Sequence, residues 1–153
     1  MTTLKRTAKP RARHTHPYPL PRQLAPDEAR ILDYWRSLLR GAAAIPFADD
    51  LKLTDIPDLK ARLFMLDAFE RPERFRFALV GSSLAADGLC GTFLDEARLP
   101  RPFEFLASQC AATVECGAPT FYRHDVERPY TRLLLPLWAE GRISTLLGAL
   151  DRA

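Results

Sequence analysis

The chain has 153 residues, of which 47% are hydrophobic and 27% charged, and its formal net charge is +3. This balance is typical of a soluble globular domain that can bury a sizeable core. No apolar run approaches the roughly 18–20 residues of a membrane-spanning helix, and no apolar block follows the first basic residues as in a secretory signal. The three cysteines form no CxxC pair and suit a reducing compartment, so a cytoplasmic protein is expected.

Residues 1–26 form a basic, proline-rich segment. Six of the 22 lysines and arginines lie within residues 1–22, which contain no acid, so 16 basic residues accompany all 19 acids in the remainder. The segment has few bulky apolar side chains, too few to offset the entropy of ordering it. We expect it to be disordered or extended, either as a solubilising tail or as a contact with nucleic acid or another anionic surface. Residues 27–153 are expected to form a single domain.

Residues 27–40 predict an amphipathic helix. Pro26, Asp27 and Glu28 suit its first turn, because proline fits there and acids favour the positive helix end. Gly41 predicts its end. Apolar residues recur between them at helical spacing, and either the chain's own sheet or a partner subunit must cover this stripe. The residues of this expected interaction helix are Ile31, Leu32, Trp35, Leu38 and Leu39.

Two runs of bulky apolar residues, Leu63–Phe69 and Phe75–Val80, flank a polar loop and predict a β-hairpin. If Phe69 pairs with Arg74, Asp67 lies opposite Arg76 as a cross-strand ion pair. The same register gives the hairpin one apolar face, made by the pairs Ala68–Phe75, Leu66–Phe77 and Phe64–Leu79.

The second half of the chain predicts a long helix followed by three strands. The helix begins at Pro102 and runs through Cys116, after short helices and turns over residues 82–100. Hairpin-length links then separate three strand-like runs, Thr120–Val126, Tyr130–Trp138 and Arg142–Leu150. The order of helix, two strands, helices and three strands predicts an α+β fold with a five-stranded antiparallel sheet.

Six segments carry a family pattern in their order and spacing: Leu32–Trp35, Asp55–Pro57, Leu63–Asp67, Phe75–Gly81 with Gly88 and Gly91, Leu133–Leu137 and Leu147–Ala149. Over about residues 27–150 the chain resembles a family of PAS-like proteins common in alphaproteobacteria. The resemblance implies a stand-alone sensory or interaction module of five strands, with helices on one face and the N-terminal amphipathic helix in addition. PAS domains as a class bind small molecules between sheet and helices, or bind partners and dimerise, and the family pattern fixes no catalytic residue.

No residue set predicts catalysis, and no enzyme activity is expected. Gly88–Leu94 is similar to the segment that holds the reactive cysteine of flavin photoreceptors, but Gly91, not Cys90, stands at the adduct position. His124 is the candidate haem ligand of the folded part, although a strand histidine is ordinarily only half-exposed. The aspartates of residues 46–60 lack the spacing of a calcium loop. Neither flavin nor haem is predicted, and no metal site is expected.

Apolar residues of the sheet and the long helix could line a ligand cavity or fill a closed core. We predict a regulatory module that acts by protein–protein interaction, including a homodimer through residues 27–40. The alternative is a sensor that binds a small apolar molecule between sheet and long helix. A weaker alternative is nucleic-acid contact through the basic tail. The pocket candidates are Phe64, Leu66, Phe77, Leu79, Phe103, Leu106, Cys110, Leu133 and Leu135.

Overall fold

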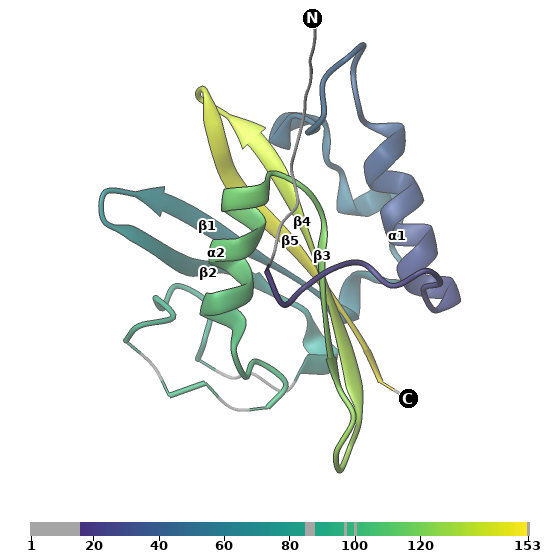
Figure 1. Cartoon of the computed structure of the whole chain (residues 1–153), viewed down its shortest axis with the longest axis vertical. Helices are drawn as coiled ribbons and strands as arrows, with labels where there is room; N and C mark the ends of the chain where they lie inside the picture. The colour runs from purple at the N-terminus through teal and green to yellow at the C-terminus, as the bar shows by residue number, and fades with distance from the viewer. Residues whose placement is uncertain (1–15, 85–87, 97, 100, 153) are drawn as a thin grey trace, which may run out of the picture.

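The computed structural model describes residues 16–84, 88–96, 98–99 and 101–152 (Figure 1). Its helices and strands are α1 (Pro26–Ser37), β1 (Leu63–Glu70), β2 (Glu73–Val80), α2 (Leu106–Cys116), β3 (Thr120–His124), β4 (Tyr130–Ala139) and β5 (Arg142–Arg152). Short 3₁₀ helices cover Ala48–Asp50, Leu53–Asp55, Lys60–Arg62 and Ser82–Leu84. Within the described residues, neither α-helix combines the length and the apolar character needed to cross a bilayer.

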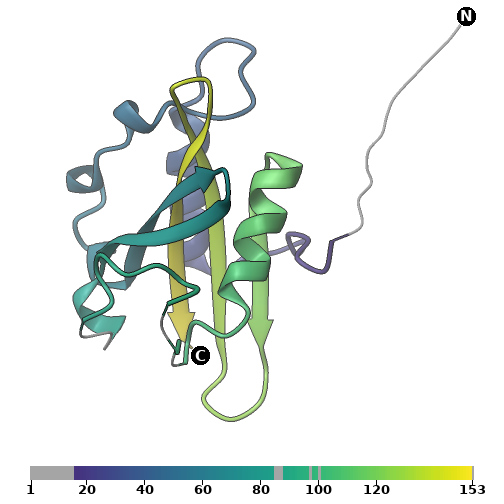
Figure 2. The same cartoon turned by 90° about the vertical axis from the view of Figure 1, so that its left-hand side faces the viewer.

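The strands form one antiparallel sheet in the order β2-β1-β5-β4-β3. This confirms the predicted α+β class and the five-stranded sheet. Helix α2 packs on one face, and the N-terminal helix α1 packs on the other (Figures 1 and 2). The inner strand β4 is therefore covered on both sides, so that Leu133, Leu134 and Leu135 are all fully buried.

Aromatic rings fill the α2 face of the sheet. The ring of Phe103 lies 5.4 Å from that of Phe64 and 5.3 Å from that of Phe77, between centroids, and all three side chains are fully buried. The Phe64 ring lies over Gly148 of β5, where a Cβ atom would come within 2.1 Å of it. The absence of a side chain at residue 148 therefore lets the ring approach the backbone of the sheet.

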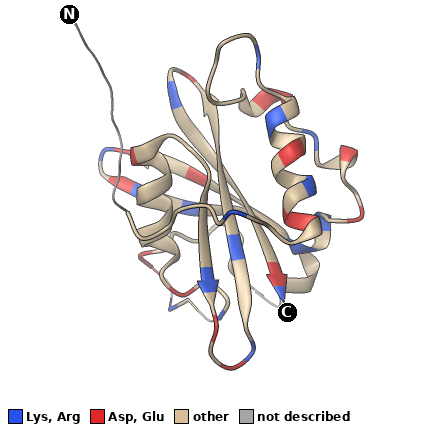
Figure 3. Ribbon diagram, turned by 45° about the vertical axis from the view of Figure 1, so that its right-hand side comes forward, with Lys and Arg blue, Asp and Glu red and all other residues tan. Residues whose placement is uncertain are grey.

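The α1 face is filled by the apolar stripe of the N-terminal helix. Ile31, Leu32 and Trp35 pack against leucines of β4 and β5. The indole Nε1 of Trp35 also donates a hydrogen bond of 2.8 Å to the carbonyl oxygen of Pro136. The chain's own sheet thus covers the stripe, which was one of the two arrangements expected. Acids and bases alternate along the outward side of the helix (Figure 3).

The hairpin of β1 and β2 follows the predicted register near its turn. Asp67 lies opposite Arg76, and a guanidinium nitrogen of Arg76 donates to the carboxylate at 2.9 Å, so the predicted ion pair is confirmed. Further from the turn a bulge shifts the pairing by one residue, and Leu79 pairs with Met65 instead of Phe64. A shift of one residue moves a side chain to the other face, so Leu79 lies on the α1 side.

A later segment of the same polypeptide covers the β2 edge of the sheet. The backbone N–H of Phe77 donates to the Thr92 carbonyl at 2.9 Å, and the N–H of Leu94 donates to the Phe75 carbonyl at 2.9 Å. Residues 89–94 therefore satisfy backbone groups that an edge strand would otherwise present to other chains.

The N-terminal segment covers part of the β3 edge. The backbone N–H of Phe121 donates to the Tyr18 carbonyl at 3.0 Å. The Tyr18 side chain is buried, and its hydroxyl donates to Ser108 of α2 at 2.8 Å. Residues 16–25 thus run irregularly along the fold and belong to it, whereas residues 1–15 of the expected tail lie outside the described residues.

Both α-helices are shorter than predicted. Helix α1 ends at Ser37 instead of residue 40, and α2 begins at Leu106 instead of Pro102. Phe105 has a left-handed backbone with φ of 60°, which is incompatible with a right-handed helix and sets the start of α2.

Arg132 of β4 fixes the segment that precedes α2. Its side chain is fully buried and donates three hydrogen bonds of 2.8 Å, to the Gln109 amide oxygen and to the backbone oxygens of Pro102 and Glu104. Burial lowers the pKa of this guanidinium. The three bonds offset part of the cost of removing the cation from water.

Candidate functional site

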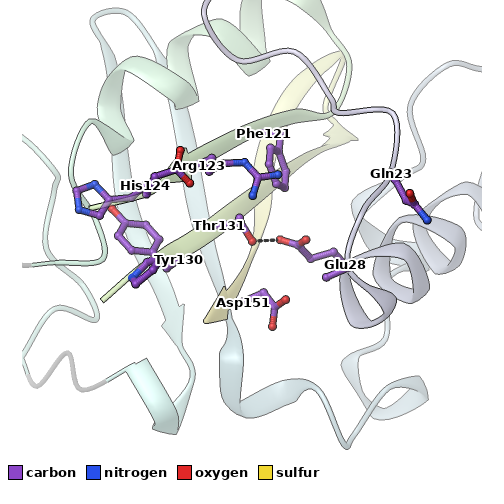
Figure 4. Close-up of a pocket in the computed structure, with 11 residues that line it drawn as sticks. Gln23, Glu28, Phe121, Arg123, His124, Tyr130, Thr131 and Asp151 are labelled. Carbon is purple, nitrogen blue, oxygen red and sulfur yellow. Dashed lines mark hydrogen bonds between the residues drawn. The ribbon is translucent and has the colours of Figure 1, made fainter. Parts of the chain in front are cut away.

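A polar hollow of about 210 Å³ lies where the start of α1 meets the ends of β3, β4 and β5 (Figure 4). Both acids and bases line it, and they come from four separate elements of the chain. Its polar lining residues are Gln23, Glu28, Arg123, His124, Asp125, Tyr130, Thr131 and Asp151.

Glu28 is the buried acid of this hollow. It is the third residue of α1. Its carboxylate accepts a hydrogen bond from the backbone N–H of Ala25, the residue that caps the helix. The hydroxyl of Thr131 on β4 donates a hydrogen bond to the same carboxylate. Glu28 is only 2% exposed, and burial raises its pKa. The side chain therefore joins the start of α1 to the sheet and holds its proton to a higher pH than an exposed glutamate does.

Asp151 and Arg123 set the charge around Glu28. The side chains of Asp151, Arg123 and Glu28 lie around Thr131 (Figure 4). Repulsion by Asp151 adds to the rise in the pKa of Glu28, and attraction by Arg123 opposes it. Asp151 is itself held by Arg62, whose nearest guanidinium nitrogen is 3.0 Å from the carboxylate. With Asp125, the hollow thus presents three acidic side chains beside one guanidinium.

This arrangement suits two kinds of chemistry. A small molecule that carries both an amino and an acidic group would find complementary charges within one concave site. A buried carboxylate with a raised pKa can also exchange a proton closer to neutral pH than an exposed one.

The predicted apolar pocket is only partly assembled. The residues that share the α2 face are fully buried and in contact as a packed core; they are Phe64, Leu66, Phe77, Phe103, Leu106 and Cys110. Leu133 and Leu135 belong to the α1 face instead, because alternate side chains of a strand point to opposite sides. Leu79 also lies on the α1 side, because of the bulge in the hairpin. The prediction that these three residues share the α2-side space is wrong.

The expected interaction helix is part of the core. Ile31, Leu32 and Trp35 are at most 5% exposed, and Leu38 and Leu39 are half-buried at the end of the helix. A partner could reach the stripe only if α1 left the sheet.

An exposed phenylalanine lies instead beside β3, next to aromatic side chains that are buried or half-buried. Phe105 is 67% exposed, and its ring lies 6.1 Å from that of Tyr122. With the nearby prolines these rings line an open groove of about 500 Å³, here termed the edge groove. Its residues are Pro17, Tyr18, Pro19, Pro21, Phe105, Phe121, Tyr122 and Arg123.

The cysteines and His124 occupy different surroundings. Cys90 is exposed, whereas burial raises the thiol pKa of Cys110 strongly and that of Cys116 as well. The ring of His124 stacks on Tyr130 at 5.2 Å, and its Nε2 atom is buried without a hydrogen-bond partner among the described residues. The described part of the chain brings no three His, Cys, Asp or Glu side chains together as a metal site.

Comparisons of the chain with protein-family models, with curated proteins and with solved structures give no match. The fold and the two surfaces described above are therefore the basis for assigning a function.

The polar hollow was missed by the sequence analysis. Arg123, Thr131 and Asp151 lie on three different strands, and only the packed sheet brings them to one place. Only Glu28 could be recognised from the local sequence, because a glutamate at the third position of a helix can accept a hydrogen bond from the backbone N–H of the capping residue. That signal predicts a helix start and says nothing about a hollow.

Proposed function

We propose that the chain is a PAS-like regulatory module that acts by protein–protein interaction through the edge groove. The five-stranded antiparallel sheet with α2 on one face supports the PAS-like assignment. The observation that carries the interaction is the exposure of Phe105, an aromatic ring that is 67% exposed beside a second ring and a row of prolines. Exposed aromatic side chains in a concave apolar surface are typical anchors of protein interfaces.

The position of the other apolar surfaces supports the same choice. Three phenylalanine rings occupy the space between the sheet and α2, and the stripe of α1 packs on the chain's own sheet. Removing either from its place would expose the core. The edge groove can receive a partner while the core stays packed.

The test compares Phe105→Ser with Val126→Ser, a matched control because Val126 is also 67% exposed but lies outside the groove. If the partner is a second copy, sedimentation velocity over a range of concentrations should show at least about tenfold weaker self-association for Phe105→Ser only. If the partner is another protein, a photo-crosslinking amino acid at position 105 should capture it and the same group at position 126 should not. Concentration-independent monomers together with equal crosslinking at both positions would refute the proposal.

A second candidate function is a small-molecule sensor that uses the polar hollow. The observation that favours it is the buried Glu28 beside Arg123 and Asp151, which gives the hollow a fixed arrangement of both charges. Native mass spectrometry of the gently purified protein should then show a retained small molecule that Arg123→Gln loses and Arg36→Gln keeps. A spectrum of the bare chain, unchanged by an added mixture of amino acids, would exclude this function.

A further inference from the structure

A second hollow, of about 280 Å³, lies on the other side of Tyr130 and is lined by three arginines. They come from three separate segments: Arg101 precedes α2, Arg128 lies in the turn between β3 and β4, and Arg152 ends β5. Pro102, Pro129 and the buried Tyr130 form the remaining walls. We refer to it as the arginine hollow.

Hydrogen bonds fix the floor of the arginine hollow. Tyr130 pairs with Arg152 in the ladder between β4 and β5. The Tyr130 hydroxyl donates to one carboxylate oxygen of Glu104, and Arg101 donates to the other oxygen at 3.1 Å. Partial burial alone would raise the pKa of Glu104, but these bonds outweigh it and lower that pKa. Glu104 is therefore ionised, and its two carboxylate oxygens hold the side chains of Tyr130 and Arg101 in place.

The fold balances the charge of the arginine hollow only at Arg101, which pairs with Glu104. The side chains of Arg128 and Arg152 make no ion pair or hydrogen bond with any described residue. Besides its pair with Glu104, Arg101 has a second, longer ion pair of 4.0 Å with Glu127. Several arginines elsewhere are matched closely by acids. The pairs Arg40–Asp50 at 2.7 Å, Arg74–Asp95 at 2.8 Å and Arg76–Asp67 at 2.9 Å are examples. Three guanidinium groups around one concavity repel one another unless an anion lies between them.

We propose that the arginine hollow binds the phosphate group of a small molecule. Guanidinium groups donate in a planar fork that matches the oxygens of phosphate, and arginines from several directions can surround one such group. The proline and tyrosine walls leave room for a small body attached to the phosphate. A nucleic-acid backbone would instead need a basic stripe, whereas the chain after residue 22 has more acids than bases. This site is independent of the edge groove.

Titration calorimetry of the full chain with sodium pyrophosphate, at an ionic strength held constant with sodium chloride, tests the proposal. We expect saturable binding that Arg128→Gln and Arg152→Gln each weaken by at least about fivefold, the size expected for loss of one charge-assisted contact. Arg36→Gln is the matched control, because it removes one exposed arginine of α1, far from the hollow, and should leave the affinity unchanged. Neither Arg128 nor Arg152 supports the core, so both variants should fold.

Two kinds of result would overturn the proposal. One is the absence of saturable binding, or an equal loss of affinity in Arg36→Gln, because either would indicate general charge attraction. The other is that a single-stranded 20-nucleotide DNA competes with pyrophosphate and binds less tightly to Arg152→Gln, because the site would then contact a nucleic-acid backbone. DNA binding that is insensitive to Arg152→Gln, through another part of the chain, agrees with the proposal.

Discussion

Gly148 decides how closely the aromatic core can approach the sheet. The Phe64 ring occupies the volume that a side chain at residue 148 would need, and Phe103 closes the ring cluster from the α2 side. Interiors at protein packing density resist the insertion of even one methyl group. A packed α2 face leaves the apolar ligand of the alternative hypothesis no ready space, so this contact bears directly on function.

Gly148→Ala should lower the free energy of unfolding by about 3 kcal/mol, because the new methyl group would overlap the Phe64 ring. Urea denaturation monitored by circular dichroism measures it. Phe64→Leu in the same chain should recover part of the loss, and the double-mutant cycle should show this coupling. If Gly148→Ala were as stable as the wild type, the ring would have room to move, and a ligand cavity on the α2 face would again be tenable.

At the scale of elements, α1 is attached to the sheet near both of its ends. Trp35 bonds to the β4 backbone near the C-terminal end of the helix, and Glu28 bonds to Thr131 of the same strand near its N-terminal end. The first attachment buries apolar area, and the second buries a carboxylate. Only the second can depend on pH.

Glu28 should make α1 docking weaken as the pH rises. Its pKa is raised in the folded chain, so the folded state binds the proton more tightly than the unfolded state. The stabilising contribution is full below the ordinary glutamate pKa of about 4.3 and is lost as the pH rises through the folded value. The loss is about 1.4 kcal/mol for each pH unit that separates the folded from the unfolded pKa. Urea denaturation between pH 4 and pH 8 should show this loss in the wild type.

Glu28→Gln removes the titrating group while keeping an oxygen that can accept the Thr131 hydrogen bond. The difference in unfolding free energy between this variant and the wild type should therefore grow in favour of the variant across the same pH range. Glu115→Gln, which changes an exposed glutamate of α2, is the control and should follow the wild type. A difference that does not vary with pH would show that the Glu28 carboxylate titrates normally.

At the scale of the whole molecule, the sequence predicted the elements and their order better than the faces they bury. Alternation placed Asp67 opposite Arg76 because a hairpin turn fixes the register beside it. The bulge that moves Leu79 to the other face could not be predicted from the local sequence, because an apolar run with one extra residue has the same pattern as a regular strand. Leu133, Leu134 and Leu135 are three consecutive apolar residues that point to alternate faces of β4. Because the run has no polar residue, its sequence did not indicate which face each leucine packs on. The polar hollow depends on the same tertiary packing.

Residues 16–25 connect layers of the fold that are distant in sequence. Tyr18 contacts β3 through its backbone and α2 through its hydroxyl, and its ring lies 6.3 Å from that of Tyr122. It also forms one wall of the edge groove. The proline-rich segment, which composition alone assigned to a tail, therefore both stabilises the sheet edge and shapes the proposed interaction surface.

Tyr18→Phe should lower the free energy of unfolding by about 1 kcal/mol, because only the hydrogen bond to Ser108 is lost. Tyr18→Ala should lower it by about 3 kcal/mol, because the buried ring is lost as well. Tyr34→Phe is a control for loss of a tyrosine hydroxyl at an exposed site, where water can replace its bonds to Asp55 and to the Lys52 backbone, and it should cost less than Tyr18→Phe. Chemical denaturation gives all three values. If Tyr18→Ala unfolds with the same midpoint and slope as the wild type, residues 16–25 do not contribute to the fold, and the edge groove loses one of its walls.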